Sequence, residues 1–416
     1  MNIIEKWLNS RIGLNFRSGL GRMEQAVHLL GMPQECYPII HVTGTNGKGS
    51  TVAFLRNLFA YQGRKVGSFT SPHMVTIHDR ICINGEPISD ADFVRLGLAV
   101  QEMEQQLRET HDQLSYFEIL TLIGLLYFRE QAVDLALIEV GIGGLLDTTN
   151  VVTGQVAVVT SVGLDHKETL GSTLAEIAEQ KAGIFKPGKT AVIGPLPAVA
   201  SQVCERVARE KSVRLYQAGQ DFILEGSGSD LNFANGQVTW SGLALGLKGQ
   251  YQQENASLAL QAFWLFCQQE GWAVDARQIA PALSGTHWSG RLEEVAPGIY
   301  LDGAHNLPAM ERLVDFIREQ KGAISILFGV LKRKDYKEML AYLQASLPDA
   351  QLTITTFAYG ETVAENDVAD LPYVADYQTY IEDFQAQAQP GQLLFVTGSL
   401  YFIAEVRAWY LEKYKK

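Results

Sequence analysis

The chain has 416 residues, of which 47% are hydrophobic and 19% are charged. This length exceeds what one ordinary core supports, so we expect two domains, and the composition is typical of a globular enzyme rather than a disordered chain. The formal net charge of −12 argues against nucleic acid as a partner, because a phosphate backbone requires a basic face. An anionic substrate would therefore have to be held by local positive charge.

The sequence also bears on the compartment. No apolar run approaches the roughly 18 residues that span a bilayer, and Met1–Ser10 lacks the apolar core of a signal peptide. The four cysteines have no metal-ligand or CxxC spacing, which favours reduced structural thiols. They are Cys36, Cys82, Cys204 and Cys267. We expect a cytoplasmic protein without a membrane partner.

The N-terminal part of the chain alternates between predicted helices and strands. Short amphipathic helices are expected within residues 1–33. Strands are expected at Tyr37–Val42, Lys65–Thr70, Val133–Val140, Gln155–Val162 and Thr190–Ile193. Helices are expected at about Ser50–Gln62, Asp90–Glu109, Phe117–Glu130 and Thr173–Lys181. Nearly continuous apolar strands are typical of a parallel sheet covered on both faces.

The character of the chain changes over residues 213–247, where short alternating strands and an Asn235-Gly236 turn predict a hairpin. A helix follows at about Asn255–Glu270, and a second series of strands and helices begins at Gly298. Its strands are expected at Ile299–Leu301, Ile324–Phe328, Leu352–Thr356 and Leu393–Val396, and its helices at about Pro308–Gln320, Lys334–Leu347, Tyr377–Ala388 and Leu400–Lys415. We predict a domain of residues 1–290, with a small β subregion at 213–247, and a second domain of residues 291–416.

A glycine-rich loop follows the first strand and opens the first long helix. Its residues are Gly44, Thr45, Asn46, Gly47, Lys48, Gly49 and Ser50. Glycines let backbone N–H groups turn inward and form an anion cradle, which the helix N-terminus reinforces. The spacing departs from GxxxxGK[ST], and a plain glycine turn with an incidental lysine is the alternative. We predict a nucleotide phosphate site in which Lys48 reaches the outer phosphates and Ser50 faces Mg²⁺.

Polar residues also follow several predicted strands. Ser71, Glu139 and His166 each come at or just after the end of an apolar strand. Carboxyl ends of parallel strands share one edge, where ligands bind, and these donors together with Ser50 suit one or two Mg²⁺ ions. Each residue also has an alternative interpretation when it is considered alone. Ser71 precedes a proline and is typical of a turn, and His166 could be a structural histidine. Glu139 is harder to dismiss, since burying an unpaired carboxylate is costly.

The segment Thr43–Ser50 resembles the variant phosphate loop of the Mur ligase superfamily, specifically that of folylpolyglutamate and dihydrofolate synthases. Further segments in chain order strengthen the resemblance. They are Gly143–Asn150, Glu179–Gly188, Gly249–Ala256, Ser289–Glu293, Leu301–Asn306 and Thr397–Tyr401. The resemblance implies an α/β fold, with an N-terminal P-loop-type ATPase domain built on a parallel sheet and a smaller, Rossmann-like C-terminal domain.

The resemblance also implies roles for particular residues. Catalytic roles fall on Lys48, Glu139, His166, Lys181 and His305; Asn255, Arg291 and Asp302 join the loop residues Thr45 to Ser50 as ATP contacts. Metal ligands fall on Ser50, Ser71, Glu139 and His166. The lysine that matches Lys181 is commonly carbamylated in the family, whereas a solvated lysine would be the default. Folate contacts fall on Leu20, Phe117, Glu118, Leu146 and Asp147, with Phe16–Arg22 as a further wall.

Three positions depart from the family pattern. Leu145 stands where an arginine is usual, Arg333 replaces an aspartate, and Tyr251 replaces a histidine. The first departure bears on the substrate side and the second on a loop of the C-terminal domain.

We expect an ATP-dependent, ADP-forming ligase that adds L-glutamate to folate through an acyl phosphate, acting as a monomer. Three alternatives remain: an enzyme that also joins dihydropteroate to glutamate, another Mur-type amide ligase, and a nucleotide-binding module without ligase chemistry. Peptidoglycan-type Mur ligases carry an extra N-terminal domain, whereas the phosphate loop here begins at Gly44, which disfavours that reading.

Overall fold

The computed structural model describes residues 2–13, 19–368 and 371–414. These residues form two compact units. The N-terminal unit comprises residues 1–71, 77–246 and 253–286, and the C-terminal unit comprises 72–76, 247–252 and 287–416. Two short segments, 72–76 and 247–252, thus interrupt the N-terminal unit in sequence and belong to the C-terminal unit. The predicted division at residues 290 and 291 remains a prediction.

A mostly parallel sheet is the framework of the N-terminal unit. Within the described residues it has eight strands in the order β4-β3-β2-β5-β1-β6-β7-β8. The bounds are β1 (Ile39–Thr43), β2 (Val66–Phe69), β3 (Ile81–Ile83), β4 (Glu86–Pro87), β5 (Leu135–Glu139), β6 (Val156–Val159), β7 (Thr190–Ile193) and β8 (Arg214–Gln217). Only β3 and β4 run antiparallel to their neighbours. The predicted parallel sheet is confirmed, and β1 lies at its centre between β5 and β6.

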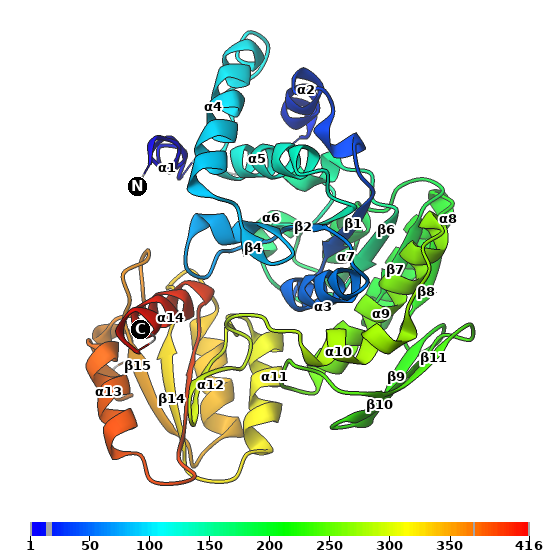
Figure 1. The fold of residues 1–416 in the computed structure, drawn as a ribbon. Helices are drawn as coiled ribbons and strands as arrows, with labels where there is room; N and C mark the ends of the chain where they lie inside the picture. The colour runs from blue at the N-terminus through cyan, green and yellow to red at the C-terminus, as the bar shows by residue number, and fades with distance from the viewer. Residues whose placement is uncertain (1, 14–18, 369–370, 415–416) are drawn as a thin grey trace. The chain divides into compact units, whose positions relative to one another are not determined.

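Helices and short 3-10 turns surround this sheet (Figure 1). The helices are α1 (Ile3–Asn9), α2 (Gly21–Leu29), α3 (Lys48–Tyr61), α4 (Asp90–Leu107), α5 (Tyr116–Glu130), α6 (Lys167–Leu170), α7 (Leu174–Ala182), α8 (Ala198–Glu210), α9 (Tyr251–Glu270) and α10 (Ile279–Ser284). The 3-10 turns are η1 (Pro33–Glu35), η2 (Ile77–Arg80), η3 (Thr148–Val151) and η4 (Ala276–Gln278). Helix α8 was not among the predicted elements.

Apolar side chains of the helices form the core against the strands. Ile123 of α5 belongs to a buried cluster with Ile138 of β5, and Ile177 of α7 belongs to another with Val159 of β6. The boundaries of α5 follow from local chemistry. Ser115 accepts a hydrogen bond from the backbone N–H of Glu118, and the Glu118 carboxylate accepts one from the backbone N–H of Ser115, which satisfies N–H groups that a helix start leaves unpaired.

The predicted β subregion is a separate antiparallel sheet in the order β11-β10-β9. Its strands are β9 (Ile223–Ser227), β10 (Asp230–Ala234) and β11 (Thr239–Leu243). The turn between β10 and β11 contains Asn235, whose side-chain oxygen accepts hydrogen bonds from the N–H groups of Gln237 and Val238. Gly236 has a φ of 76°, which glycine adopts without strain.

The C-terminal unit is a second α/β layer structure. Its described residues form a six-stranded sheet in the order β12-β13-β17-β14-β15-β16. The strands are β12 (Glu293–Ala296), β13 (Ile299–Leu301), β14 (Ile324–Gly329), β15 (Gln351–Thr355), β16 (Tyr373–Val374) and β17 (Leu393–Thr397). The helices are α11 (Leu307–Arg318), α12 (Tyr336–Ser346), α13 (Tyr377–Gln387) and α14 (Leu400–Tyr414), with a 3-10 turn η5 (Glu365–Asp367). Strands β13, β17, β14, β15 and β16 pair in parallel, and β12 is an antiparallel strand at the edge of the sheet.

Two buried clusters show how this second sheet is covered. Leu313 of α11 and Leu343 of α12 belong to the cluster that includes Phe395, whereas Ile381 of α13 and Phe402 of α14 belong to the other. The two pairs of helices therefore pack against different sets of strand residues. In Figure 1, α11 and α12 lie on one side of this sheet, and α13 and α14 lie on the other. Across the described part of the chain, no helix is both long and apolar enough to span a membrane.

Candidate active site

Hydrogen bonds join the loop between β1 and α3 to the residues that follow β6. The backbone N–H of Asn46 donates to the Ser161 hydroxyl at 2.9 Å, and the N–H of Thr45 donates to the Ser161 carbonyl at 3.0 Å. The Thr45 hydroxyl in turn accepts from the N–H of Gly163 at 3.0 Å. These bonds use groups on the sheet side of the loop, and they fix its path at the carboxyl end of the central strand.

Two glycines of the loop are needed because other residues approach them closely. A Cβ atom on Gly44 would lie 1.8 Å from the Thr160 hydroxyl oxygen. A Cβ atom on Gly47, which has a φ of 87°, would lie 2.3 Å from the side-chain oxygen of Asn255. Gly44 and Gly47 therefore serve both the turn and its packing. Asn255, predicted as an ATP contact, lies directly beside the loop.

The Lys48 amine folds back onto the carbonyl groups of this loop. It donates to the carbonyl oxygen of Gly44 at 2.9 Å and is 3.4 Å from that of Thr45. Ser50, two residues further along α3, is 1% exposed. Gly49 has no side chain and is buried between them. A primary amine at the start of a helix that follows a glycine turn is the arrangement that binds nucleotide phosphates.

Two predicted metal ligands meet at the same edge of the sheet. Glu139 ends β5 beside Val42 of β1 and is 3% exposed. The backbone N–H of Ser71, just beyond β2, points to the Glu139 carboxylate with an N–O distance of 3.4 Å. The structure thus brings Ser71 and Glu139 together. A carboxylate and a hydroxyl at this edge fit Mg²⁺, which prefers oxygen ligands and keeps several waters.

His166 lies at the end of the segment that follows β6 and opens the short helix α6. Its φ of 51° is in the left-handed region, which is uncommon for residues other than glycine and recurs at functional sites. The backbone N–H of His166 donates to the Asp165 carboxylate at 2.9 Å. Asp165 was not among the predicted site residues, although it directly precedes His166.

Lys181 is a buried ionisable group whose pKa departs strongly from its ordinary value. It lies on α7 and is only 2% exposed. Burial lowers the pKa of Lys181 to about 7, and repulsion from the nearby Lys48 acts in the same direction, whereas Asp165 and Asp147 oppose the shift. Near neutral pH a substantial share of this amine is therefore uncharged, which is the form that reacts with CO₂ or other electrophiles.

Asp147, a predicted folate contact, has a structural task. Its carboxylate accepts hydrogen bonds from the N–H of Ile142 and from both the N–H and the hydroxyl of Thr149. Burial raises the pKa of Asp147, and these hydrogen bonds oppose the shift. The carboxylate holds the glycine turn after β5 against η3. A contact between Asp147 and folate remains a prediction.

The other predicted folate contacts lie at the start of α5 and nearby. Phe117 is half-buried and packs against Phe69, with ring centroids 5.6 Å apart. Glu118 forms a bidentate ion pair with Arg22 of α2, at 3.0 and 2.7 Å from Nε and Nη2. Sequence analysis missed this pair, because the two residues are 96 positions apart.

Leu20 caps the start of α2 and is half-buried, as is Leu146. Leu145, which stands at the family's arginine position, is 38% exposed. The proposed wall at Phe16–Arg22 lies partly outside the described residues, since the structure does not describe residues 14–18.

The C-terminal unit arranges its own predicted residues around a turn after β13. Asp302 accepts hydrogen bonds from the N–H groups of Leu292 and Ala304, each at 3.0 Å, and is 5% exposed. Burial raises the pKa of Asp302, and the positive charge of Arg291 opposes the shift. The guanidinium of Arg291 lies over Gly303, where a Cβ atom would be 2.3 Å from Nη1.

His305 and Tyr251 belong to this same unit. The Nδ1 atom of His305 lies 2.8 Å from the carbonyl oxygen of Gly303, a contact that orients the ring. Burial raises the pKa of Tyr251, as does the charge of Asp302. Tyr251 is therefore an uncharged phenol, in contrast to the titratable histidine usual there. Arg333 is exposed beside Lys332, which pairs with Asp367 at 3.0 Å.

The order of the strands in the first sheet, the phosphate-type loop and the second α/β layer are together typical of a nucleotide-binding enzyme. Comparison with known proteins specifies the class. Residues 42–263 match the Mur ligase middle domain, and residues 290–400 match the Mur ligase glutamate ligase domain. The chain is 34% identical over 418 residues to the dihydrofolate synthase/folylpolyglutamate synthase of Bacillus subtilis (strain 168), covering 96% of this chain and 97% of the relative.

Two further comparisons agree. The folylpolyglutamate synthase of Lacticaseibacillus casei is 34% identical, with 93% of each chain covered. A solved FPGS–AMPPCP–folate complex has 32% identity and a TM-score of 0.87 over 98% of each chain. The chain therefore belongs to the Mur ligase family, as a ligase of the folylpolyglutamate synthase/dihydrofolate synthase group. The family resemblance and the fold class predicted from the sequence are confirmed.

Proposed function

We propose that this protein is an ATP-dependent ligase that adds L-glutamate to a reduced folate, releasing ADP and phosphate. The observation that carries the proposal is the loop at Gly44–Ser50 at the head of α3, in a chain of the folylpolyglutamate synthase group. A similar structure contains both AMPPCP and folate, which supports the nucleotide and the acceptor. L-glutamate follows from the names of the relatives and from the match to a glutamate ligase domain.

The reaction needs activation, because a carboxylate does not condense with an amine in neutral water. The γ-phosphoryl group of ATP passes to the folate carboxylate and gives an acyl phosphate and ADP. The amine of glutamate then attacks the acyl carbon, the amide bond forms, and phosphate leaves. The protein contributes positioning and positive charge, as in other phosphoryl transfers.

Particular side chains have stated tasks in this scheme. The N–H groups of Gly47 to Gly49 hold the phosphates, because those of Thr45 and Asn46 already donate to Ser161. The Lys48 amine turns from its loop carbonyls toward the outer phosphates. Asn255 borders the loop at Gly47. In the C-terminal unit, Arg291 contributes a guanidinium and His305 an imidazole, and the Asp302 carboxylate fixes the turn beside them. Their contact with ATP is part of the proposal.

Ser50, Ser71, Glu139 and His166 would hold one or two Mg²⁺ ions. The closeness of the Ser71 N–H to Glu139 and the burial of that carboxylate support this set. When bound, Mg²⁺ would offset the negative charge that develops on the phosphates.

Lys181 is proposed to carry a carbamate. The uncharged amine attacks CO₂, a C–N bond forms, and one proton is released, so that a neutral amine becomes an anionic carbamate. The pKa of Lys181 at about 7 supports this step, since the amine needs no strong base to become reactive. The carbamate would lie near Lys48, whose charge would stabilise it.

The test is an ADP-release assay with the purified chain, MgATP, tetrahydrofolate and L-glutamate. We expect ADP release to depend on both co-substrates, and mass spectrometry to show folate lengthened by one glutamate unit for each ADP. ADP release that is indifferent to folate and glutamate would contradict the ligase proposal and favour a simple ATPase or a nucleotide-binding module.

A second activity has a specific observation in its favour. The relative from Bacillus subtilis is named for both dihydrofolate synthase and folylpolyglutamate synthase activities, and it matches this chain almost end to end. We propose dihydropteroate as a second acceptor. The same assay, with dihydropteroate in place of tetrahydrofolate, decides between one acceptor and two.

We further propose that the enzyme acts as a monomer in the cytoplasm. The substrates are small molecules, and the free cysteines among the described residues form no disulfide, which suits a reducing compartment. Light scattering at assay concentration, and fractionation of cells expressing the chain, test the two statements.

A further inference from the structure

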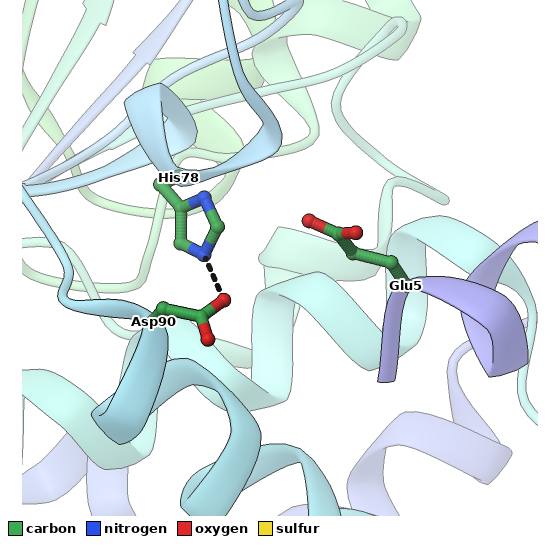
Figure 2. A group of neighbouring side chains, drawn as sticks. All are labelled: Glu5, His78 and Asp90. Atoms are coloured by element: carbon green, nitrogen blue, oxygen red, sulfur yellow. Dashed lines mark ion pairs between the residues drawn. The ribbon is translucent and has the colours of Figure 1, made fainter. Parts of the chain in front are cut away.

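Three side chains with metal-binding donor atoms lie together on the N-terminal unit, at a place that the ligase reaction does not use. Glu5 comes from α1, His78 from η2, and Asp90 is the first residue of α4. One donor atom from each lies within 4.8 Å of the other two. Figure 2 shows the Glu5 carboxylate pointing toward the His78–Asp90 pair.

Neighbouring residues hold these donors in place. The Glu5 carboxylate accepts a hydrogen bond from the N–H of Asn2 at 2.9 Å, and the Asn2 side-chain amide donates to Asp90 at 2.7 Å. The His78 ring packs against Phe93 of α4, with centroids 4.7 Å apart. The triad is thus built by contacts among α1, η2 and α4, and it does not rest on one flexible side chain.

The imidazole of His78 provides a second, independent observation. Its Nε2 atom is buried, and none of the described residues offers it a hydrogen-bond partner. The Asp90 oxygen lies 3.6 Å away, which is an ion-pair distance only if the ring is protonated and is too long for a good hydrogen bond. A buried polar atom without a partner calls for an ion or an ordered water.

We propose that Glu5, His78 and Asp90 bind one divalent transition-metal ion of the Zn²⁺ type. One imidazole nitrogen and two carboxylate oxygens suit such an ion, whereas Mg²⁺ and Ca²⁺ favour all-oxygen sites. Zinc bonds of roughly 2.0–2.2 Å require the donors to close in slightly, and the exposed Asp90 side chain has room to do so. The bound ion ties α1 to η2 and α4.

The test is a zinc titration of the metal-free full chain, without a histidine tag, followed by calorimetry in excess Mg²⁺. We expect wild-type protein to bind one Zn²⁺ that His78→Gln and Glu5→Gln bind about tenfold or more weakly. Zinc should raise the melting temperature of wild type and leave that of His78→Gln unchanged. Co²⁺ in place of Zn²⁺ should give visible d–d absorption that both variants lack.

Two control variants sharpen the outcome. His28→Gln removes an exposed histidine of α2 and should keep the zinc site. Glu139→Gln removes a proposed Mg²⁺ ligand and should also keep it, which separates this site from the phosphate region. Equal zinc binding by wild type and His78→Gln would overturn the proposal, as would the absence of any zinc bound in excess Mg²⁺.

Discussion

The side-chain oxygen of Asn255 lies so close to Gly47 that a Cβ atom on Gly47 would be only 2.3 Å from it. Asn255 belongs to α9, and Gly47 is the residue that precedes α3. The phosphate-type loop is therefore packed against a helix more than two hundred residues further along the chain. Any side chain at Gly47 must displace either the loop or Asn255.

We accordingly expect Gly47→Ala to reduce ADP formation about a hundredfold or more, because displacements near 1 Å at a reacting centre cost that much. Gly63→Ala is the matched control. Gly63 also has a positive φ, of 78°, but a Cβ there meets no atom within 4 Å. Both variants pay the left-handed backbone cost of about 1 kcal/mol. Equal loss of activity in the two would mean that strain, and not the contact with Asn255, matters.

Activity should depend on CO₂ through Lys181. The amine is uncharged above its pKa of about 7, so the carbamate forms there and is lost as the pH falls through 7. We expect CO₂-depleted buffer to lower the rate near pH 7 and added bicarbonate to restore it. A rate that does not respond to bicarbonate at any pH would contradict the modification.

Lys181→Met should abolish this bicarbonate response without unfolding the protein. In the unfolded chain a lysine keeps its proton up to its ordinary pKa of 10.5, so the wild-type chain must give up part of a proton on folding at neutral pH. Methionine removes that cost. We expect a melting temperature equal to or above that of wild type, measured by calorimetry.

Glu139→Gln should raise the Mg²⁺ concentration needed for half-maximal rate about tenfold or more. The change keeps the shape of a side chain that is 3% exposed and removes its charge. Glu86→Gln, at an exposed glutamate of β4, is the control and should leave Mg²⁺ dependence unchanged. A large fall in melting temperature with normal Mg²⁺ dependence would show that Glu139 is a structural residue.

Asp147→Asn distinguishes a turn-holding carboxylate from a folate contact. The new amide N–H₂ would face donors that now point at Asp147, from Ile142 and Thr149. We expect a loss of about 1–3 kcal/mol in unfolding free energy, measured by denaturant titration. A higher KM for folate with unchanged stability would instead support direct contact with the substrate.

Arg22→Met should raise the KM for folate and leave that for ATP unchanged. The Arg22–Glu118 pair joins α2 to the start of α5, beside Phe117, and both side chains are nearly buried. Removing one partner leaves an uncompensated charge at some cost in stability. Arg95→Met breaks an exposed pair with Glu130 and should change neither constant. Equal KM values in all three proteins would separate this pair from the folate site.

Much of the fold follows from local sequence patterns. Apolar runs located β7 and β13 with the bounds that the structure has, and Ser115 and Glu118 mark the start of α5 within one residue of the prediction. The β-hairpin turn at Asn235 is equally local. These features depend on neighbouring residues, so the sequence alone suffices to predict them.

The site was predictable only where a motif spans one short segment. Gly44–Ser50 and the polar residues at the end of β5 and beyond β2 and β6 were predicted in this way. Asn255 was predicted as an ATP contact, but its packing against Gly47 was not foreseen, and neither was the Arg22–Glu118 pair, because each joins residues far apart in the chain. The shift in the pKa of Lys181 likewise arises from burial and from charged or ionisable residues elsewhere in the chain, so it has no signature in the sequence around Lys181.

The chain passes between its two compact units at residues 71–72, 76–77, 246–247, 252–253 and 286–287. No single cut in the gene would therefore release either unit whole. A fragment that ends near residue 286 would contain segments 72–76 and 247–252 without the rest of the C-terminal unit. A fragment that begins there would lack these two segments. Circular permutation or split-protein complementation of this enzyme must start from junctions inside one unit, such as the exposed hairpin turn at Gly228.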